Sequence, residues 1–110
     1  INMKIACEML NSLGYKFRCA YDGKQALKIL KNNFEDLILM DIQMPELNGY
    51  ETTKIIRKNE VGKNVHIPII AMTAYAMQGD KEMCIEMGMD DYISKPFDIN
   101  ILGKTISKFI

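Results

Sequence analysis

The chain has 110 residues, and its 14 acidic residues balance its 14 basic ones, so it has no formal net charge at pH 7. This length fits one domain with one core. Because the basic side chains are scattered, direct nucleic-acid binding is not expected. The apolar runs are far shorter than the roughly 20 residues of a membrane-spanning helix, and no signal segment opens the chain. We therefore expect no direct membrane contact and a cytoplasmic location, whether or not a larger parent protein is membrane-anchored.

The cysteines and the two ends of the chain indicate a piece of an intracellular protein. Cys7, Cys19 and Cys84 are odd in number and widely spaced, which is typical of buried thiols and not of disulfides or a zinc site. The sequence begins on Ile1, inside an apparent helix, and ends on Ile110 without a polar tail. We expect one domain, residues 1–110, truncated at its amino terminus.

Helical and extended patterns alternate along the whole chain. Gly14 and Gly88 each follow a helical pattern and predict left-handed helix stops, while Asp22 predicts the N-cap of the second helix. Apolar spacing predicts helices near residues 5–13, 22–33, 50–56, 80–87 and 102–109, and strands at 16–20, 37–41, 67–73 and around Tyr92.

This alternation predicts an α/β fold, a doubly wound parallel sheet in three α/β/α layers of the flavodoxin-like type. In the flavodoxin-like strand order 2-1-3-4-5, the first strand lies between the second and third strands. Here a helix comes first, so the opening strand is missing and its place would be a slot inside the sheet. We expect a strand of about 5 or 6 residues, located upstream or lent by another chain, with dimer formation or strand exchange as one route.

Three reactive groups follow apolar strand patterns. Asp41 ends the run 37–40, Thr73 ends the run 68–72, and Lys95 follows residues 91–94. Because ligands bind outside the carboxyl ends of strands in open parallel sheets, these side chains are expected to meet on one rim. A carboxylate, a hydroxyl and an ammonium would then face a common ligand.

Four separated motifs now make the chain resemble the receiver domain of two-component response regulators, most closely the receivers attached to hybrid sensor histidine kinases. The resemblance covers essentially the whole chain apart from the opening strand. The motifs are Leu39-Met40-Asp41-Ile42-Gln43-Met44-Pro45 with Asn48-Gly49-Tyr50-Glu51, then Ile69-Ile70-Ala71-Met72-Thr73-Ala74, Gly88-Met89-Asp90-Asp91-Tyr92, and Ser94-Lys95-Pro96-Phe97.

The resemblance implies that Asp41 accepts a phosphoryl group from a phosphohistidine. Phosphoryl transfer requires in-line positioning and stabilised charge on the equatorial oxygens. Lys95, the Thr73 hydroxyl and the Ala74 backbone N–H would bind those oxygens. Magnesium would be held by Asp41 and the backbone carbonyl of Gln43. The family's pair of acidic metal ligands ends the first strand and is absent from this sequence.

Further roles also come from the resemblance. Tyr92 would turn inward with Thr73 as a phosphorylation switch, and Gln43 and Tyr75 would tune dephosphorylation. The partner would be a histidine kinase or a histidine phosphotransfer domain, and the chain itself holds no kinase catalytic domain.

Alternatives from other classes remain open. A receiver-like interaction module that has lost phosphorylation would keep the same fold. A haloacid-dehalogenase-type phosphatase also uses an Asp like Asp41 but requires a second Asp where Gln43 stands, and no Gly-rich phosphate loop follows any strand. We expect His66 to be a surface residue, and Asp90 and Asp91 to form a polar turn and not a metal pair.

Overall fold

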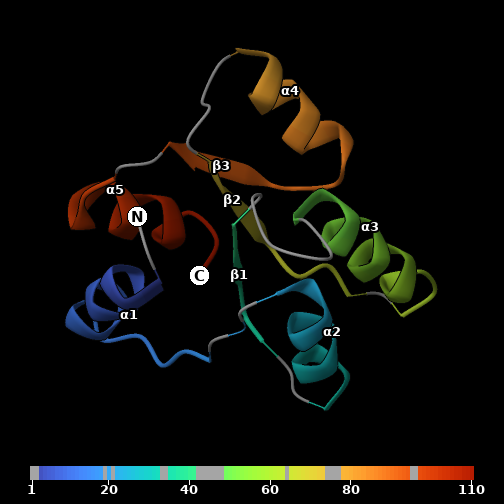
Figure 1. Ribbon diagram of the computed structural model, residues 1–110, viewed down its shortest axis with the longest axis horizontal. Coiled ribbons are helices and arrows are strands. Elements are labelled where there is room, and N and C mark those ends of the chain that lie inside the picture. Colours follow the sequence, from blue (N-terminus) through green and yellow to red (C-terminus); the bar gives the residue numbers. More distant parts are fainter. Residues whose placement is uncertain are drawn as a thin grey trace.

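The computed structural model describes residues 3–18, 20, 22–32, 35–41, 49–63, 65–73, 78–94 and 97–110. Within these residues, helices and strands alternate after an opening helix pair (Figure 1). The elements are α1 (Met3–Ser12), α2 (Gly23–Asn32), β1 (Ile38–Asp41), α3 (Gly49–Glu60), β2 (Ile69–Thr73), α4 (Gln78–Glu86), β3 (Asp91–Ser94) and α5 (Ile99–Ser107). No helix among them is both long enough and apolar enough to cross a bilayer.

The three strands form one parallel sheet in the order β1-β2-β3. Ile38 is in register with Ile69 at the start of the β1–β2 pair, and Ile70 is in register with Asp91 at the start of the β2–β3 pair. The central strand is the most buried, since Ile69 and Ile70 have no exposed surface. A near-continuous apolar strand of this kind is typical of a sheet covered on both faces.

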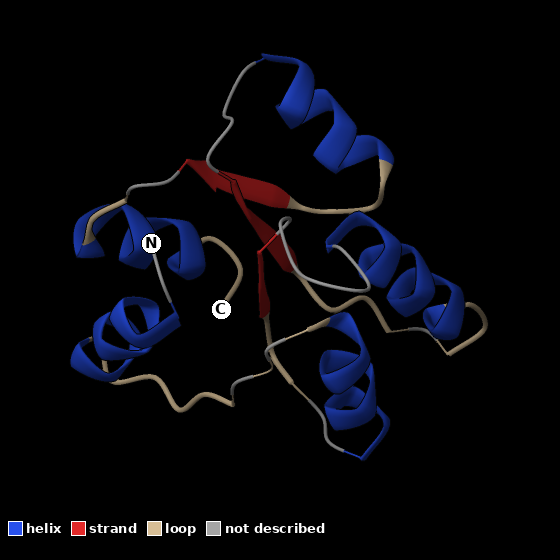
Figure 2. Cartoon of the chain, in the orientation of Figure 1, coloured by secondary structure: helices blue, strands red, loops and turns tan. Residues whose placement is uncertain are grey.

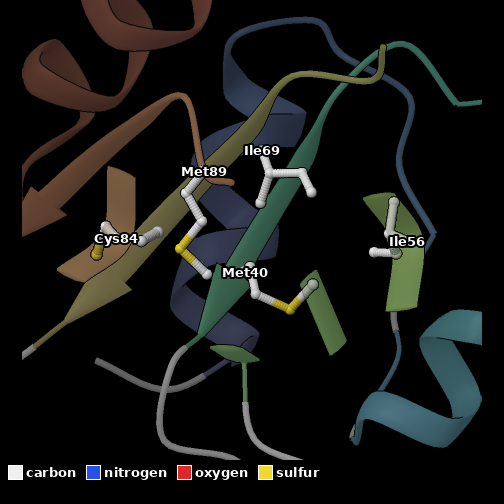
Figure 3. Packing of buried hydrophobic residues seen from close by; sticks show 6 residues of the cluster. Met40, Ile56, Ile69, Cys84 and Met89 are labelled. Atoms are coloured by element: carbon white, nitrogen blue, oxygen red, sulfur yellow. The ribbon is translucent and has the colours of Figure 1, made fainter. Parts of the chain in front are cut away.

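Each face of the sheet has its own apolar cluster, and Figure 2 shows the helices on both sides of the strands. On one face, side chains from α2, α3 and α4 pack around Met40, Ile69 and Met89. Figure 3 shows Ile56 of α3 and Cys84 of α4 in this cluster. On the other face, α1 and α5 pack around Ile70 and Ile93. The two faces confirm the predicted three-layer, doubly wound arrangement.

The predicted helix boundaries at Gly14, Asp22 and Gly88 are confirmed by backbone geometry. Gly14 has φ +85° and Gly88 has φ +100°, a region in which only glycine is unstrained. At each stop the residue after the glycine donates to the carbonyl five positions back, as in a Schellman motif. Asp22 caps α2, because its Oδ1 accepts from the Gln25 amide at 2.8 Å.

The predicted strand at residues 16–20 is wrong for the part that the structure describes. Residues 15–18 and residue 20 have no strand hydrogen bonding, and the described sheet stops at β1. A strand exists only where a neighbouring chain segment completes its ladder of hydrogen bonds. The stretch is flanked by a cavity instead of a strand, described below.

A polar network holds the amino-terminal ends of β2 and β3 together. It consists of Arg57, Glu60, His66 and Asp90, and we call it the Arg57 network. The guanidinium donates to the Gly88 carbonyl, the Ile67 carbonyl, Glu60 Oε1 and Asp90 Oδ2, each at 2.8 Å. Asp90 Oδ2 also accepts from the Ile69 amide at 2.8 Å, and His66 Nε2 lies 2.7 Å from Asp90 Oδ1. The side chain of one α3 residue thus ties α3 to the starts of β2 and β3.

Candidate functional site

The carboxyl ends of β1 and β2 bring two of the predicted site residues to one rim. Asp41 is the last residue of β1 and pairs in register with Met72, so Thr73, the last residue of β2, stands one position further along the neighbouring strand. Adjacent strands lie about 4.8 Å apart. The carboxylate and the hydroxyl are therefore carried by neighbouring strand ends at the edge where parallel sheets bind ligands.

The side chains of Thr73 and Tyr92 belong to the same face of the sheet. Tyr92 is in register with Ala71, and both pack in the cluster covered by α2, α3 and α4. Thr73 follows Ala71 by two residues, and side chains two apart on a strand share a face. Thr73 is 3% exposed and Tyr92 is half-buried. Thr73 and Tyr92 therefore lie on the face of the sheet that α2, α3 and α4 cover.

Asp41 differs from Thr73 in its access to solvent. It is half-buried, and it lines a cavity that runs along the outer edge of β1. A carboxylate that is fixed at a strand end and reachable from outside is suited to attack a ligand that arrives from solvent.

Four predicted site residues lie outside the described residues: Gln43, Ala74, Tyr75 and Lys95. Ala74 directly follows Thr73, and Lys95 directly follows Ser94, which is the end of β3 and in register with Thr73.

Asp41 is the only predicted metal ligand whose side chain the structure describes. Within the described residues, no group of three or more His, Cys, Asp or Glu side chains gathers around a common point. Magnesium keeps several water ligands and commonly takes only one or two protein carboxylates together with oxygens of the phosphate substrate. The accessible carboxylate of Asp41 therefore fits a magnesium ion, as one donor in a mainly water- and substrate-coordinated shell.

Sequence reasoning missed the importance of Asp90, which it interpreted only as part of a turn. Its carboxylate contacts Arg57, His66 and the Ile69 amide. His66 is exposed, with 58% of its side-chain surface accessible, as expected for a surface residue. The partners of Asp90 are 21 to 33 residues away in the sequence, so no local sequence pattern predicts these contacts.

Comparisons with known proteins agree with this geometry. The sequence profile of the response regulator receiver domain matches residues 1–107. The chain is 46% identical over 112 residues to hybrid signal transduction histidine kinase I of Dictyostelium discoideum, covering 97% of this chain and 6% of the kinase. It is 39% identical over 110 residues to the polar-differentiation response regulator DivK of Brucella ovis, covering 100% of this chain and 88% of DivK.

Solved structures show the same fold. The receiver domain of sensor histidine kinase PA1611 from Pseudomonas aeruginosa PAO1, which has a magnesium ion coordinated in its active site cleft, is similar with a TM-score of 0.87 and 42% identity. The match covers 98% of this chain and 87% of that one. The Ssk1 receiver domain, solved with the Saccharomyces cerevisiae histidine phosphotransfer protein Ypd1, gives a TM-score of 0.86 at 32% identity, covering 96% and 79%. These likenesses confirm the predicted flavodoxin-like fold.

Proposed function

Because the chain belongs to the response regulator receiver family of two-component signalling, we propose that it accepts a phosphoryl group from a phosphohistidine onto Asp41. The observation that carries this proposal is the position of Asp41 and Thr73 at the ends of adjacent parallel strands, with the carboxylate reachable from solvent. A nucleophile and a hydrogen-bond donor then flank one site for a tetrahedral anion.

In the proposed reaction a carboxylate oxygen of Asp41 attacks phosphorus and forms an acyl phosphate. The phosphorus–nitrogen bond of the donor breaks, and its electron pair returns to the imidazole nitrogen, which takes up a proton. The protein mainly aligns the groups and stabilises the charge of the equatorial oxygens. We assign the Thr73 hydroxyl, the Lys95 ammonium and the Ala74 backbone N–H to that stabilisation.

Magnesium, when bound, would neutralise part of the phosphoryl charge, and Asp41 with the backbone carbonyl of Gln43 would hold it. The magnesium ion in the cleft of the PA1611 receiver supports this choice of metal. Because the family's acidic pair is absent from this sequence, we expect slow phosphorylation of the chain by small-molecule donors. Gln43 and Tyr75 are assigned to tuning the lifetime of the acyl phosphate.

The proposed partner is a histidine kinase or a histidine phosphotransfer domain in the cytoplasm. The chain spans 6% to 13% of the first six relatives, which are histidine kinases, so a relay inside a hybrid kinase is the favoured setting. The complex of the Ssk1 receiver with Ypd1 supports a phosphotransfer protein as partner.

Phosphoryl transfer to Asp41 is tested with magnesium and phosphoramidate, whose phosphorus–nitrogen bond resembles that of phosphohistidine. The mass of the intact chain should rise slowly by one phosphoryl group, and borohydride trapping of the acyl phosphate should place the label at residue 41. Asp41→Asn should abolish the label. Asp36→Asn removes an exposed carboxylate just before β1 and serves as a matched control that should label like the parent chain.

Persistence of the label in Asp41→Asn would contradict the proposal. If neither phosphoramidate nor a phosphorylated histidine phosphotransfer protein labels the parent chain, the alternative of a receiver-like interaction module is favoured instead.

Tyr92 is the proposed switch because it shares a packed face with Thr73. Phosphorylation adds roughly two negative charges, which can draw the Thr73 hydroxyl toward the phosphate and free space for the ring. Tyr92→Ala should abolish the difference in partner affinity between the phosphorylated and unphosphorylated chain, measured by titration with a phosphotransfer protein. An unchanged difference would exclude this role.

A further inference from the structure

Each of the three strands ends on a polar residue. β1 ends on Asp41, β2 on Thr73 and β3 on Ser94. The proposed function uses the first two of these residues, and it uses Lys95, which directly follows Ser94 in the chain. Ser94 has no part in that reaction, although it carries a hydroxyl at the same end of the sheet.

The side chains of Thr73 and Ser94 lie next to each other on one face of the sheet. The two residues are in register. Two positions earlier Ala71 and Tyr92 are also in register, and both pack in the cluster covered by α2, α3 and α4. Because side chains two apart on a strand share a face, Thr73 and Ser94 project to this face together. Paired Thr and Ser side chains on neighbouring strands can join their hydroxyls in a hydrogen bond.

The two hydroxyl residues differ in exposure and in their distance from the proposed acceptor. Thr73 is 3% exposed, whereas Ser94 is exposed, so the Ser94 hydroxyl can turn without any loss of packing. The strand order is β1-β2-β3, which places Thr73 between the strand of Asp41 and the strand of Ser94. Ser94 can therefore act on a phosphoryl group at Asp41 only through Thr73.

The chemistry of a hydroxyl allows such an action. A hydroxyl donates one hydrogen bond and accepts up to two. When Thr73 donates to a phosphoryl oxygen, its own oxygen can still accept a hydrogen bond from Ser94. Hydrogen bonds that are joined in a chain polarise and strengthen one another.

We propose that Ser94 is a positioning residue for phosphoryl transfer. Its hydroxyl donates to the Thr73 oxygen, which aligns the Thr73 hydroxyl and makes it a stronger donor to the phosphoryl group. Each proton stays on its own oxygen. This inference rests on the proposed phosphorylation of Asp41, and it adds a residue that acts beside the phosphoryl site without touching the phosphoryl group.

The first test compares rates of phosphoryl uptake from phosphoramidate with magnesium. Ser94→Ala should slow uptake by about threefold to tenfold, as expected when one hydrogen bond is lost. Ser94→Thr keeps the hydroxyl and should stay within about twofold of the parent rate. Ser107→Ala removes an exposed hydroxyl from α5 and is the matched control, which should label like the parent chain. Because all three substitutions are at exposed positions, the melting temperature should change by no more than about 4 °C.

The second test asks whether the effect of Ser94 depends on Thr73, and it is a double-mutant cycle. In a Thr73→Val chain the accepting oxygen is absent, so the added Ser94→Ala should change the rate by less than about 1.5-fold. In a Thr73→Ser chain the oxygen is kept, and Ser94→Ala should slow uptake about as much as in the parent. A general structural effect would instead slow uptake equally in all these chains.

Equal rates in Ser94→Ala and the parent chain would overturn the inference. Equal slowing by Ser94→Ala with and without the Thr73 hydroxyl would also overturn it. Both results leave Asp41 as the phosphoryl acceptor. If neither phosphoramidate nor a phosphorylated phosphotransfer protein labels the parent chain at Asp41, the proposed function fails and this inference fails with it. The two failures are therefore distinguished by the label on the parent chain.

Discussion

The two ends of the sheet, where the strands begin and where they end, differ in their polar contacts. At the amino edge, one guanidinium reaches four acceptors on α3, before β2 and before β3. At the carboxyl ends of the strands, Asp41 and Thr73 are the last residues of β1 and β2, and Asp41 lines a cavity. The Arg57 network and the proposed phosphoryl site thus lie at opposite ends of the sheet and share no residue.

The largest effect is expected when the guanidinium of Arg57 is removed. Arg57→Met should lower the free energy of unfolding by about 3 kcal/mol, because it leaves the carboxylates of Glu60 and Asp90, which are 12% and 21% exposed, without their cationic partner. The melting temperature should fall by roughly 10–20 °C. Chemical denaturation measures the effect.

Lys58→Met is the matched control, since this residue is the exposed neighbour on α3, and it should change stability by less than about 0.5 kcal/mol. Phosphoryl uptake per folded molecule should be the same in Arg57→Met and in the parent chain. A loss of uptake without a loss of stability would show that the two edges are not separate in function.

The complementary experiment removes the hydroxyl of Thr73 at the carboxyl end of β2. Thr73→Val should slow phosphoryl uptake by roughly tenfold to a hundredfold, or about 2 kcal/mol of transition-state stabilisation, because one donor to the phosphoryl oxygens is lost. Thr73→Ser keeps the hydroxyl and should retain most of the rate. Rates come from the phosphoramidate assay. Equal rates in Thr73→Val and the parent chain would remove Thr73 from the proposed site.

The smallest expected effect is at the rim of the Arg57 network. His66 contacts Asp90 at 2.7 Å, but its side chain is 58% exposed, and exposed pairs contribute little. His66→Gln should change the free energy of unfolding by less than about 0.5 kcal/mol, measured by urea denaturation. A loss as large as that of Arg57→Met would make His66, and not Arg57, the central residue of the network.

Local signals in the sequence predicted the elements well. Gly14, Asp22 and Gly88 mark helix ends through backbone preferences that act within a few residues, and the structure confirms each of them. Asp98 gave a similar signal that the sequence analysis did not use, since its Oδ1 caps α5 by accepting from the Ile101 amide at 2.9 Å.

Features that depend on distant partners were predicted less well. The strand at residues 16–20 was wrong because a strand requires a neighbour, and its own pattern cannot supply one. Asp90 was interpreted as a turn residue, although Arg57, 33 residues away, makes it a link between three elements. The placement of Asp41 and Thr73 at adjacent strand ends followed from the pattern of their strands. The roles of all the proposed site residues remain predictions, and Lys95, Ala74, Gln43 and Tyr75 lie outside the described residues.

The sulfur atoms in the core provide a built-in chemical probe. Met40, Cys84 and Met89 are at most 4% exposed and lie in one cluster (Figure 3), whereas Cys7 on α1 is partly accessible. An alkylating reagent reaches a buried thiol only when its surroundings open. The alkylation rate of Cys84 would therefore measure how frequently α4 separates from the sheet. Cys7 serves as the internal reference for reagent reactivity, so no label has to be engineered into the chain.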